Sequence, residues 1–418
     1  MIKDLYRKVL EIFTGNILSQ AIGLLTLPVL LKLYDSDSVG SYFTYMAIIN
    51  LLSILTSFQF PTLIVQSKSV DEAKTVYRFA TKTVLILSLI FAIVAAIGVR
   101  KLHFSNNNLL LIFIALFIGV FSMSLLNLCE ALMSRLKRFK QISISRILKS
   151  LFLSLFQVLS AFMFSAKGEL LILATIIGYS LTSLLIIIFY LPSTKSNFCL
   201  SNYKGKFTFL LHNTINTILN TSSSQLIIIL LRMYYGTSAA AYYGIAQKVI
   251  GIPITFISQS LSTVLYQHLS FIKNELKVLK SAIYKVYKPL VGLYFLSFLL
   301  VEIIIGIAMA FGIFNEWESV YYIIFIVSPW LFFMFWTIPL SNLIPILNKQ
   351  KEAIAYSTSL FVFRILTISI CGAMQTSFYT TMIIITLVGI VFNGVYLRFI
   401  YNAVKNHDNI VKGQNDEF

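Results

Sequence analysis

The sequence predicts an all-α integral membrane protein with twelve transmembrane helices in two six-helix bundles. The chain of 418 residues is 58% hydrophobic and 12% charged, whereas soluble proteins average about 25% charged residues. Its apolar stretches are each long enough to cross a hydrocarbon core of about 30 Å, which takes about 20 helical residues. The chain also aligns with itself after a shift of 200 positions, which predicts two related halves.

The spans are expected to be helices because unpaired backbone groups are too costly in lipid, and no alternating ten-residue segments favour a barrel. Three prolines in the tenth span, Pro329, Pro339 and Pro345, predict that it is bent, because proline removes a backbone donor. The twelve spans are expected at residues 10–33, 39–65, 76–99, 108–133, 142–164, 169–191, 207–234, 238–267, 285–312, 317–347, 352–374 and 377–403.

The distribution of basic residues predicts how the chain crosses the membrane. If the N-terminus is inside, the inner loops and tails hold 26 of the 33 basic residues, six of them between the fourth and fifth spans. The outer loops hold only Lys32, Arg100, Lys101 and Lys167. The positive-inside rule therefore places both termini in the cytoplasm. The net charge of +17 then reflects topology and contact with lipid surfaces, and we predict no nucleic-acid partner.

Few residues in the sequence are suited to catalysis or to binding a metal. Cys129, Cys199 and Cys371 are scattered and have the spacing of neither a zinc site nor a disulfide framework, so we predict no metal and no cofactor. The four histidines are dispersed, and no loop exceeds about 20 residues if each span has the usual length. A membrane enzyme usually needs clustered acids and histidines or a sizeable extramembrane segment. The sequence therefore favours a protein that is not an enzyme.

The internal repeat is carried by polar and aromatic residues around the first hairpin of each half. Six spans separate the copies, so the halves share one topology and are expected to be related by a pseudo-two-fold axis along the membrane normal. We predict bundles at 1–191 and 207–403, a cytoplasmic linker at 192–206 and a cytoplasmic tail at 404–418. A cavity between the halves is the expected substrate path. The matched pairs include Thr14 with Thr214, Asn16 with Asn216, Tyr34 with Tyr234, Ser38 with Ser238 and Tyr42 with Tyr242.

Two hairpin sequences resemble those of a known family. The stretches LLTLPVLLKLYDSDSVGSYFTYMAIINLL at 24–52 and FPTLIVQSKSVDEAKTVYRF at 60–79 resemble the opening of Wzx-type polysaccharide flippases. The stretch at 222–270 is similar to the second-half hairpin of the same family, with Ala246, Lys248 and Pro253 in order. These flippases belong to the multidrug/oligosaccharidyl-lipid/polysaccharide (MOP) exporter superfamily.

The resemblance implies a MATE-like fold and a cationic central cavity in a protein of the bacterial inner membrane. It implies that the protein moves undecaprenyl-diphosphate-linked oligosaccharide, an O-antigen or capsule repeat unit, from the cytoplasmic to the outer leaflet by alternating access. The implied partners are this glycan, membrane lipids and other polysaccharide-assembly proteins. The alternatives are a multidrug or cation antiporter of the same superfamily and a membrane polysaccharide polymerase.

Lys248 is the first candidate for contact with such a substrate. It lies about ten residues into its span, or about 15 Å deep at 1.5 Å per residue, which is near the middle of the bilayer. An ionisable residue there is costly and functional by default, and Lys248 also falls at the basic position of the family. The alternatives are an ion pair with an internal partner and a side chain that extends to the surface.

Arg364 lies about midway along the eleventh span, and a guanidinium can bind a diphosphate bidentately. The alternative is a structural ion pair with Glu302 of the ninth span. We expect Glu302 to be a counter-ion to Lys248 or Arg364 rather than a proton-coupling site. A cation antiporter is expected to carry acids in its cavity, so a single mid-span acid argues against one. Arg232 lies close to an outer loop, so we expect it to extend to the interface, with the mouth of the cavity as the alternative.

The start of the seventh span is unusually polar for a membrane helix. In HNTINTILNTSSSQ at 212–225, Asn213, Asn216, Asn220 and Ser224 follow three- and four-residue steps and therefore share one face. Such a face would be penalised against lipid. It is therefore either a cavity wall that contacts sugar or a surface for hydrogen bonds between helices.

Overall fold

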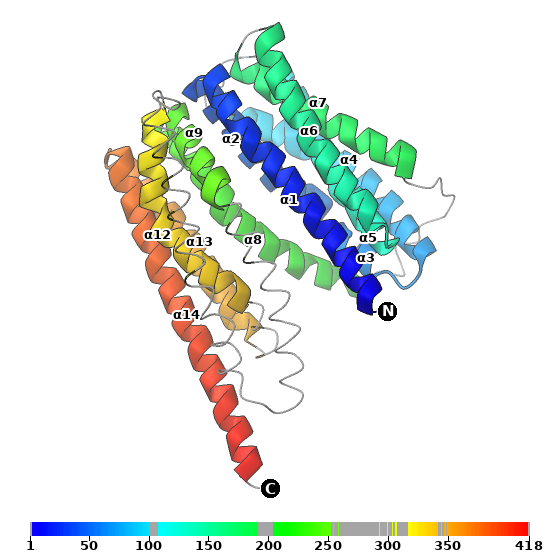
Figure 1. The fold of residues 1–418 in the computed structure, drawn as a ribbon, viewed down its shortest axis with the longest axis vertical. Helices are drawn as coiled ribbons and strands as arrows, with labels where there is room; N and C mark the ends of the chain where they lie inside the picture. Colours follow the sequence, from blue (N-terminus) through cyan, green and yellow to red (C-terminus); the bar gives the residue numbers. More distant parts are fainter. Residues whose placement is uncertain are drawn as a thin grey trace. The chain divides into compact units, whose positions relative to one another are not determined.

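The structure is a computed structural model that describes most of the chain as helix (Figure 1). Contacts between residues divide the chain into two compact units, unit 1 at Met1–Ala241 and unit 2 at Tyr242–Phe418. The predicted linker at 192–206 lies almost entirely outside the described residues, so the predicted bundle boundaries stay a prediction. The described residues are 2–99, 108–164, 166–190, 204–251, 317–341 and 349–416, with isolated positions at 254, 258, 292, 299, 303, 306, 344 and 347.

The helices follow the expected spans closely. Those of unit 1 are α1 Ile2–Leu33, α2 Ser36–Ser57, α3 Phe60–Gln66, α4 Val70–Val99, α5 Leu109–Arg135, α6 Phe139–Met163, α7 Gly168–Tyr190 and α8 Lys204–Tyr235. The helix α9, Thr237–Ala246, crosses the boundary between the units and continues as a π-helical segment at Gln247–Gly251. Unit 2 further contains α12 Glu318–Ser341, α13 Gln350–Ala373 and α14 Phe378–Asp416.

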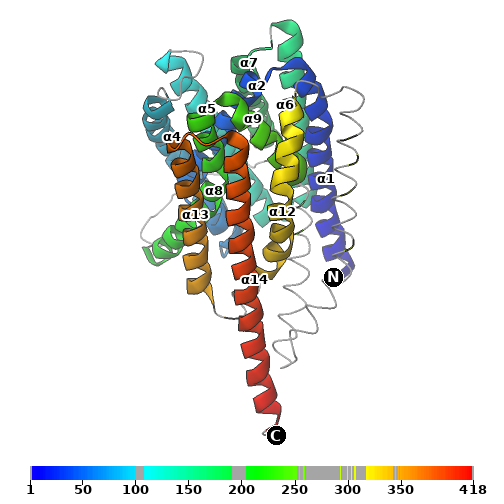
Figure 2. The same ribbon diagram turned by 90° about the vertical axis from the view of Figure 1, so that its left-hand side faces the viewer.

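Eight of the described helices are long and apolar enough to cross a membrane, and α12 makes a ninth if its two bent parts form one span. The helix α8 is not among them, because the polar run at 212–225 lowers its hydropathy. The ninth predicted span, 285–312, lies almost wholly outside the described residues. The predicted tail at 404–418 is mostly a continuation of α14, which extends past α12 and α13 (Figures 1 and 2).

Unit 1 is held together by an apolar core and by hydrogen bonds between helices. The core between α2, α4, α5 and α7 includes Tyr45, Ile49 and Leu116. At the α1–α6 contact, the Tyr34 hydroxyl donates to the Gln157 carbonyl at 2.8 Å. The Gln157 side chain in turn donates to the Thr175 hydroxyl of α7 at 2.9 Å. Polar side chains in a membrane helix are thus satisfied by neighbouring helices rather than exposed to lipid.

The second expected span, 39–65, is broken into α2 and α3. Phe58 and Gln59 both have positive φ, at 42° and 54°, and Phe58 caps α2 in a left-handed conformation. Pro61 follows in the first turn of α3. Proline lacks the N–H that would continue the α2 ladder, but its fixed φ suits the start of a new helix. The break therefore occurs directly before the proline, inside a stretch for which the sequence predicted one span.

Proline also accounts for the shape of α12. This helix bends by 41° between its parts Glu318–Leu331 and Phe333–Ser341, just after Pro329. The bend agrees with the bent tenth span predicted from its three prolines. Within unit 2, α12 packs against α14 and α14 packs against α13 (Figure 2).

The boundaries of the helices support the internal repeat. Both α1 and α8 have 32 residues. The first hairpin turns between Leu33 and Ser36, and the corresponding turn lies between Tyr235 and Thr237. These positions agree with the 200-residue shift to within two residues. The two hairpins are therefore equivalent in secondary structure as well as in sequence.

Candidate functional site

Lys248 lies in a π-helical segment at the end of α9. The segment Gln247–Gly251 interrupts the regular α-helical ladder, and such segments are frequent at functional sites. The side chain of Lys248 is half-buried. Among the described residues, no carboxylate lies within ion-pair distance of its ammonium. Lys248 thus lies on a locally widened helical turn. Its predicted depth places it inside the bilayer.

Arg364 is buried in unit 2 against an aromatic ring. The residue is 6% exposed, and the guanidinium carbon lies 4.4 Å from the centroid of the Trp330 ring of α12. Tyr243 and Tyr356 lie close enough to interact electrostatically with the same guanidinium. The face of an aromatic ring attracts a cation, most strongly when water is excluded. This contact stabilises the guanidinium without neutralising its charge.

Tyr243 connects these two candidates. Its side chain is fully buried in α9 and interacts electrostatically with Arg364. The Gln247 amide, which precedes Lys248 directly, donates to the Tyr243 hydroxyl at 2.8 Å. Within unit 2, Tyr243 therefore interacts with both the π-helical segment that carries Lys248 and the buried guanidinium of Arg364. The sequence predicted both cations but not this connection.

Arg232 lies in unit 1, in the last turn of α8. It is 6% exposed, and its guanidinium donates to the Ser41 hydroxyl of α2 at 3.2 Å. The carboxylate of Asp37 interacts with it electrostatically. The side chain is therefore at the outer end of α8, as expected, but α2 covers it and supplies its partners, so it is buried rather than exposed at the interface.

The polar face of α8 is described only in part. The side chains of Asn213, Asn216 and Asn220 lie outside the described residues, as does Glu302. Ser224 is half-buried and donates to the Thr221 carbonyl of its own helix at 2.9 Å. On the same stretch, the Thr217 hydroxyl accepts a hydrogen bond from Gln59 at 2.9 Å. Thr217 is not one of the four residues of the predicted polar face, so the role of that face stays a prediction.

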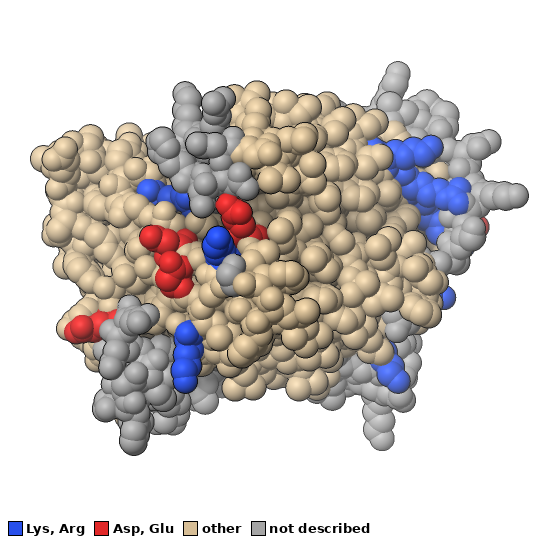
Figure 3. Space-filling view, turned by 90° about the horizontal axis from the view of Figure 1, so that it is seen from above, with Lys and Arg blue, Asp and Glu red and all other residues tan. Residues whose placement is uncertain are grey.

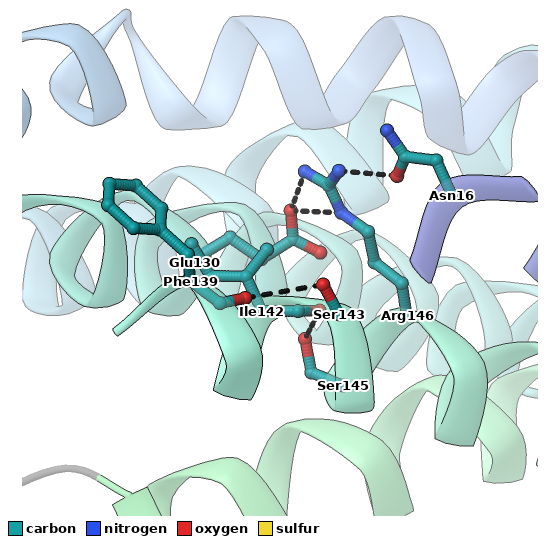
Figure 4. A network of polar contacts seen from close by, with 7 residues as sticks. All are labelled: Asn16, Glu130, Phe139, Ile142, Ser143, Ser145 and Arg146. Carbon is teal, nitrogen blue, oxygen red and sulfur yellow. Dashed lines mark hydrogen bonds and ion pairs between the residues drawn. The ribbon is translucent and has the colours of Figure 1, made fainter. Parts of the chain in front are cut away.

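A second charged cluster lies in unit 1 and was missed by the sequence analysis. The Arg146 guanidinium of α6 donates through two nitrogens to one oxygen of Glu130 on α5, at 2.6 and 3.0 Å (Figure 4). Its third nitrogen donates to the Asn16 side chain of α1 at 2.5 Å. Lys149 interacts electrostatically with both charged partners. Three helices therefore meet at one ion pair with a further cation beside it.

The signal for this cluster was present in the sequence. Arg146 and Lys149 are two of the six basic residues counted with the loop between the fourth and fifth spans, yet both lie within the expected span 142–164. Their three-residue spacing places them on one face of a helix. The loop between the fourth and fifth predicted spans therefore holds four basic residues rather than six, and α6 begins at Phe139. Both residues are therefore within the helix, in its third and fourth turns.

The chain is similar to a known protein family and to several solved structures. A model of the family described as "Polysaccharide biosynthesis protein" matches residues 29–306. No curated protein sequence matches the chain. Among solved structures, an inward-facing multidrug resistance MATE family transporter of the MOP superfamily matches with a TM-score of 0.68 at 14% identity, over 93% of this chain and 96% of that one.

Two further structures match over 96% of both chains. One is an outward-facing multidrug resistance MATE family transporter, with a TM-score of 0.60 at 14% identity. The other is a MOP superfamily transporter from Pyrococcus furiosus, with a TM-score of 0.59 at 13% identity. At this identity the likeness establishes the fold, and it confirms the all-α, MATE-like architecture predicted above. The family match begins at residue 29, within the first stretch that resembled Wzx-type flippases, and covers the other two stretches in full. The chain therefore belongs to the polysaccharide biosynthesis protein family, and it is a multi-pass membrane protein whose fold is similar to that of MATE transporters.

Proposed function

We propose that this protein is a flippase rather than an enzyme. Its substrate is undecaprenyl-diphosphate-linked oligosaccharide, an O-antigen or capsule repeat unit. The protein moves this substrate from the cytoplasmic to the outer leaflet of a bacterial inner membrane by alternating access. Membership of the polysaccharide biosynthesis family supports a glycan substrate, and the MOP fold supports transport.

The observation that carries this proposal is the cationic character of unit 2. Arg364 is buried against Trp330, and Lys248 lies on the π-helical segment that Gln247 joins to Tyr243. Two cations inside the membrane are stabilised when they bind an anion. The diphosphate is the part of this substrate that a bilayer excludes most strongly. The guanidinium binds phosphate oxygens bidentately and the ammonium adds a point charge.

The acidic residues argue against a cation antiporter. Within the described spans, Glu130 is the one carboxylate that lies beyond the first helical turn, and Arg146 already pairs with it at 2.6 Å. A site for cationic drugs in the middle of the membrane would require a carboxylate at that depth that is available to the drug. The MOP transporter from Pyrococcus furiosus is described as having a binding pocket of reverse polarity that suggests a different function. That description is compatible with an anionic cargo for a member of this fold.

The remaining roles follow from the same proposal. Asn213, Asn216, Asn220 and Ser224 contact the sugars along one face of α8, and Arg232 serves the packing of α2 on α8. Glu302 acts as the counter-ion of Lys248 or Arg364 when no substrate is bound. The distribution of basic loops supports cytoplasmic termini, so the diphosphate enters from the inside. Membrane lipids and other polysaccharide-assembly proteins are the remaining partners.

The test is complementation of a bacterial strain that lacks its own flippase and makes a glycan of known structure. We expect the wild-type protein to restore surface polysaccharide and to remove the lipid-linked glycan that accumulates on the inner leaflet. Lys248→Gln should insert normally but leave that glycan in place, because it removes the charge that meets the diphosphate. Lys248→Arg, which keeps the charge, should restore part of the flux.

Lys349→Gln serves as the matched control, since Lys349 has a half-exposed side chain and pairs with Glu352 at the start of α13. It should complement as well as the wild type. Full complementation by Lys248→Gln at wild-type protein levels would remove Lys248 from the mechanism. Resistance to cationic drugs without any change in surface glycan would favour the antiporter instead.

A further inference from the structure

Unit 1 contains a cavity that the proposed function does not use. It lies between α2, α5 and the start of α7 and has a volume of about 480 Å³. This volume is within the range of about 300–1,000 Å³ that is usual for small-molecule sites. The lining residues belong entirely to unit 1, and Lys248 and Arg364 are not among them. The cavity is therefore a feature of its own.

The walls of the cavity are apolar and reach the outer surface of the helices. They include Ile48 of α2, Leu111, Ile114 and Ile118 of α5, and Leu173 of α7. Leu111 and Leu173 are 50% and 48% exposed, so the cavity opens along the flank where these spans meet hydrocarbon. An acyl chain from the bilayer can enter such an opening without crossing a polar barrier. The walls thus fit the tail of a lipid.

One end of the cavity is acidic. Asp35, Asp37 and Glu169 line it together with Lys167, at the end of unit 1 where α2 and α7 begin. Figure 3 looks onto this end of the molecule and shows acidic side chains gathered around a basic one. Because hydrophobic spans begin here, these residues lie at the level of lipid headgroups. The cavity therefore has apolar walls and one charged end, which is the order of tail and headgroup in a phospholipid.

The charges at this end suit a zwitterionic headgroup. One oxygen of Asp35 accepts from the Ser38 backbone at 2.9 Å, and one oxygen of Asp37 accepts from the Ser238 hydroxyl at 3.0 Å. Both carboxylates are thereby held in place with acceptor capacity remaining. No ion pair within the described part of the chain involves Glu169. Three carboxylates can accept from an ammonium group, and Lys167 can bind a phosphate.

We propose that this cavity binds a phospholipid with a primary ammonium headgroup, such as phosphatidylethanolamine. One acyl chain lies between α5 and α7, the ammonium group donates to Glu169 and Asp37, and Lys167 contacts the phosphate. An anionic headgroup such as that of phosphatidylglycerol offers only neutral hydroxyl donors, and its net negative charge is repelled by the carboxylates. A choline headgroup keeps the positive charge but has no N–H to donate. This inference does not depend on the glycan substrate.

Native mass spectrometry of the detergent-solubilised full-length protein tests the proposal. Phosphatidylethanolamine, phosphatidylcholine and phosphatidylglycerol with identical acyl chains are added at equal concentration. We expect the ethanolamine lipid to bind about tenfold more tightly than either of the others, the ratio that one charge-assisted hydrogen bond supplies. Ethanolamine and a simple alkylammonium ion, added alone, should not compete, because they lack the chain that fills the cavity.

Two pairs of variants separate the headgroup from the tail. Glu169→Gln should abolish the preference, whereas Glu318→Gln should keep it, because both acids lie in the first turn of a helix but only Glu169 lines the cavity. Leu173→Trp should reduce binding of all three lipids by filling the cavity. Ile177→Trp, one turn further along α7 and 50% exposed, does not line it and should leave binding unchanged.

Unchanged melting temperatures without added lipid establish that the variants fold. Equal binding of all three lipids by the wild type would overturn the headgroup assignment. A wild-type preference that survives Glu169→Gln and Leu173→Trp would overturn the location. Tighter binding of the free alkylammonium ion than of the lipid would show that the site takes a small cation rather than a phospholipid. None of these results depends on whether the protein moves a glycan.

Discussion

At the scale of single residues, the site depends on how a guanidinium is kept charged inside the membrane. Arg364 is 6% exposed and lies on the face of Trp330, with the two rings of Tyr243 and Tyr356 near it. The sequence located Arg364 in the middle of its span but not its aromatic partner. Trp330 is 34 positions earlier in the chain, and only the packing of the folded helices brings the two together.

Substitution of Arg364 tests whether charge or shape matters more. Arg364→Gln should abolish complementation, whereas Arg364→Lys should retain a small part of it, since lysine keeps the charge but loses the planar stack. Trp330→Leu should weaken transport by the equivalent of about 0.5–2 kcal/mol, the usual strength of a cation–π contact. The control Arg398→Gln removes the same charge from an exposed position of α14 and should have little effect. Equal activity of Arg364→Gln and wild type would contradict the assignment.

The contribution of the Arg146–Glu130 pair to the free energy of unfolding can be measured directly. Both side chains are mostly buried, at 28% and 20% exposure, and Asn16 adds a third helix to the contact. Glu130→Gln should lower the free energy of unfolding by about 1.5–3 kcal/mol, the value of a hydrogen bond to a charged group. The double variant Glu130→Gln/Arg146→Gln should recover part of this loss, because no charge remains unpaired.

Thermal melting in detergent, arranged as a double-mutant cycle, measures this coupling. Additive effects of the two substitutions would show that the pair contributes nothing specific. In the sequence, Arg146 was only one of the basic residues counted with an inner loop. Its pairing with Glu130 could not be predicted, because it depends on how α5, α6 and α1 pack.

At the scale of helices, hydropathy located the spans and missed their irregularities. The expected start of the fifth span, 142, differs from the start of α6 by three residues. The break at Phe58–Gln59 and the π-helical turn at Gln247–Gly251 have no signature in hydropathy. Both precede a proline by two residues, Pro61 and Pro253 respectively. A proline removes a donor from the preceding turn, but which irregular conformation results depends on the surrounding packing.

Gly40 provides a test of packing between helices. A Cβ atom at this position would lie 2.0 Å from the Thr237 carbonyl oxygen, so α2 approaches the first residue of α9 more closely than any residue other than glycine permits. Gly40→Ala should lower the free energy of unfolding by about 1–3 kcal/mol, the usual effect of overpacking. The control is Gly98→Ala in α4, where nothing lies within 4 Å and alanine favours the helix by about 1 kcal/mol.

The two glycine variants should therefore change the melting temperature in opposite directions. If Gly40→Ala melts at the wild-type temperature, α2 does not approach Thr237 as closely as described. Because the same substitution is made in both cases, the comparison removes any general effect of adding a methyl group to a membrane helix.

At the scale of the whole molecule, charge and hydropathy together predicted the architecture. A composition with 12% charged residues predicted a polytopic membrane protein, and the 200-residue repeat predicted equivalent hairpins, which the structure has at α1–α2 and α8–α9. The substrate could not be read in the same way. Sugars are bound by ordinary polar side chains in many arrangements, so the chemistry of the cargo is argued from where the cations lie.

The central claim is that the cationic residues of unit 2 carry a diphosphate across the membrane. The direct measurement is transfer of lipid-linked glycan between the leaflets of vesicles that contain the purified protein. The account predicts that the wild type moves undecaprenyl-diphosphate-linked glycan about tenfold or more faster than a neutral polyprenyl glycan with the same sugars, and that Lys248→Gln/Arg364→Gln loses this difference. Equal rates for the charged and neutral lipids with the wild-type protein would contradict it.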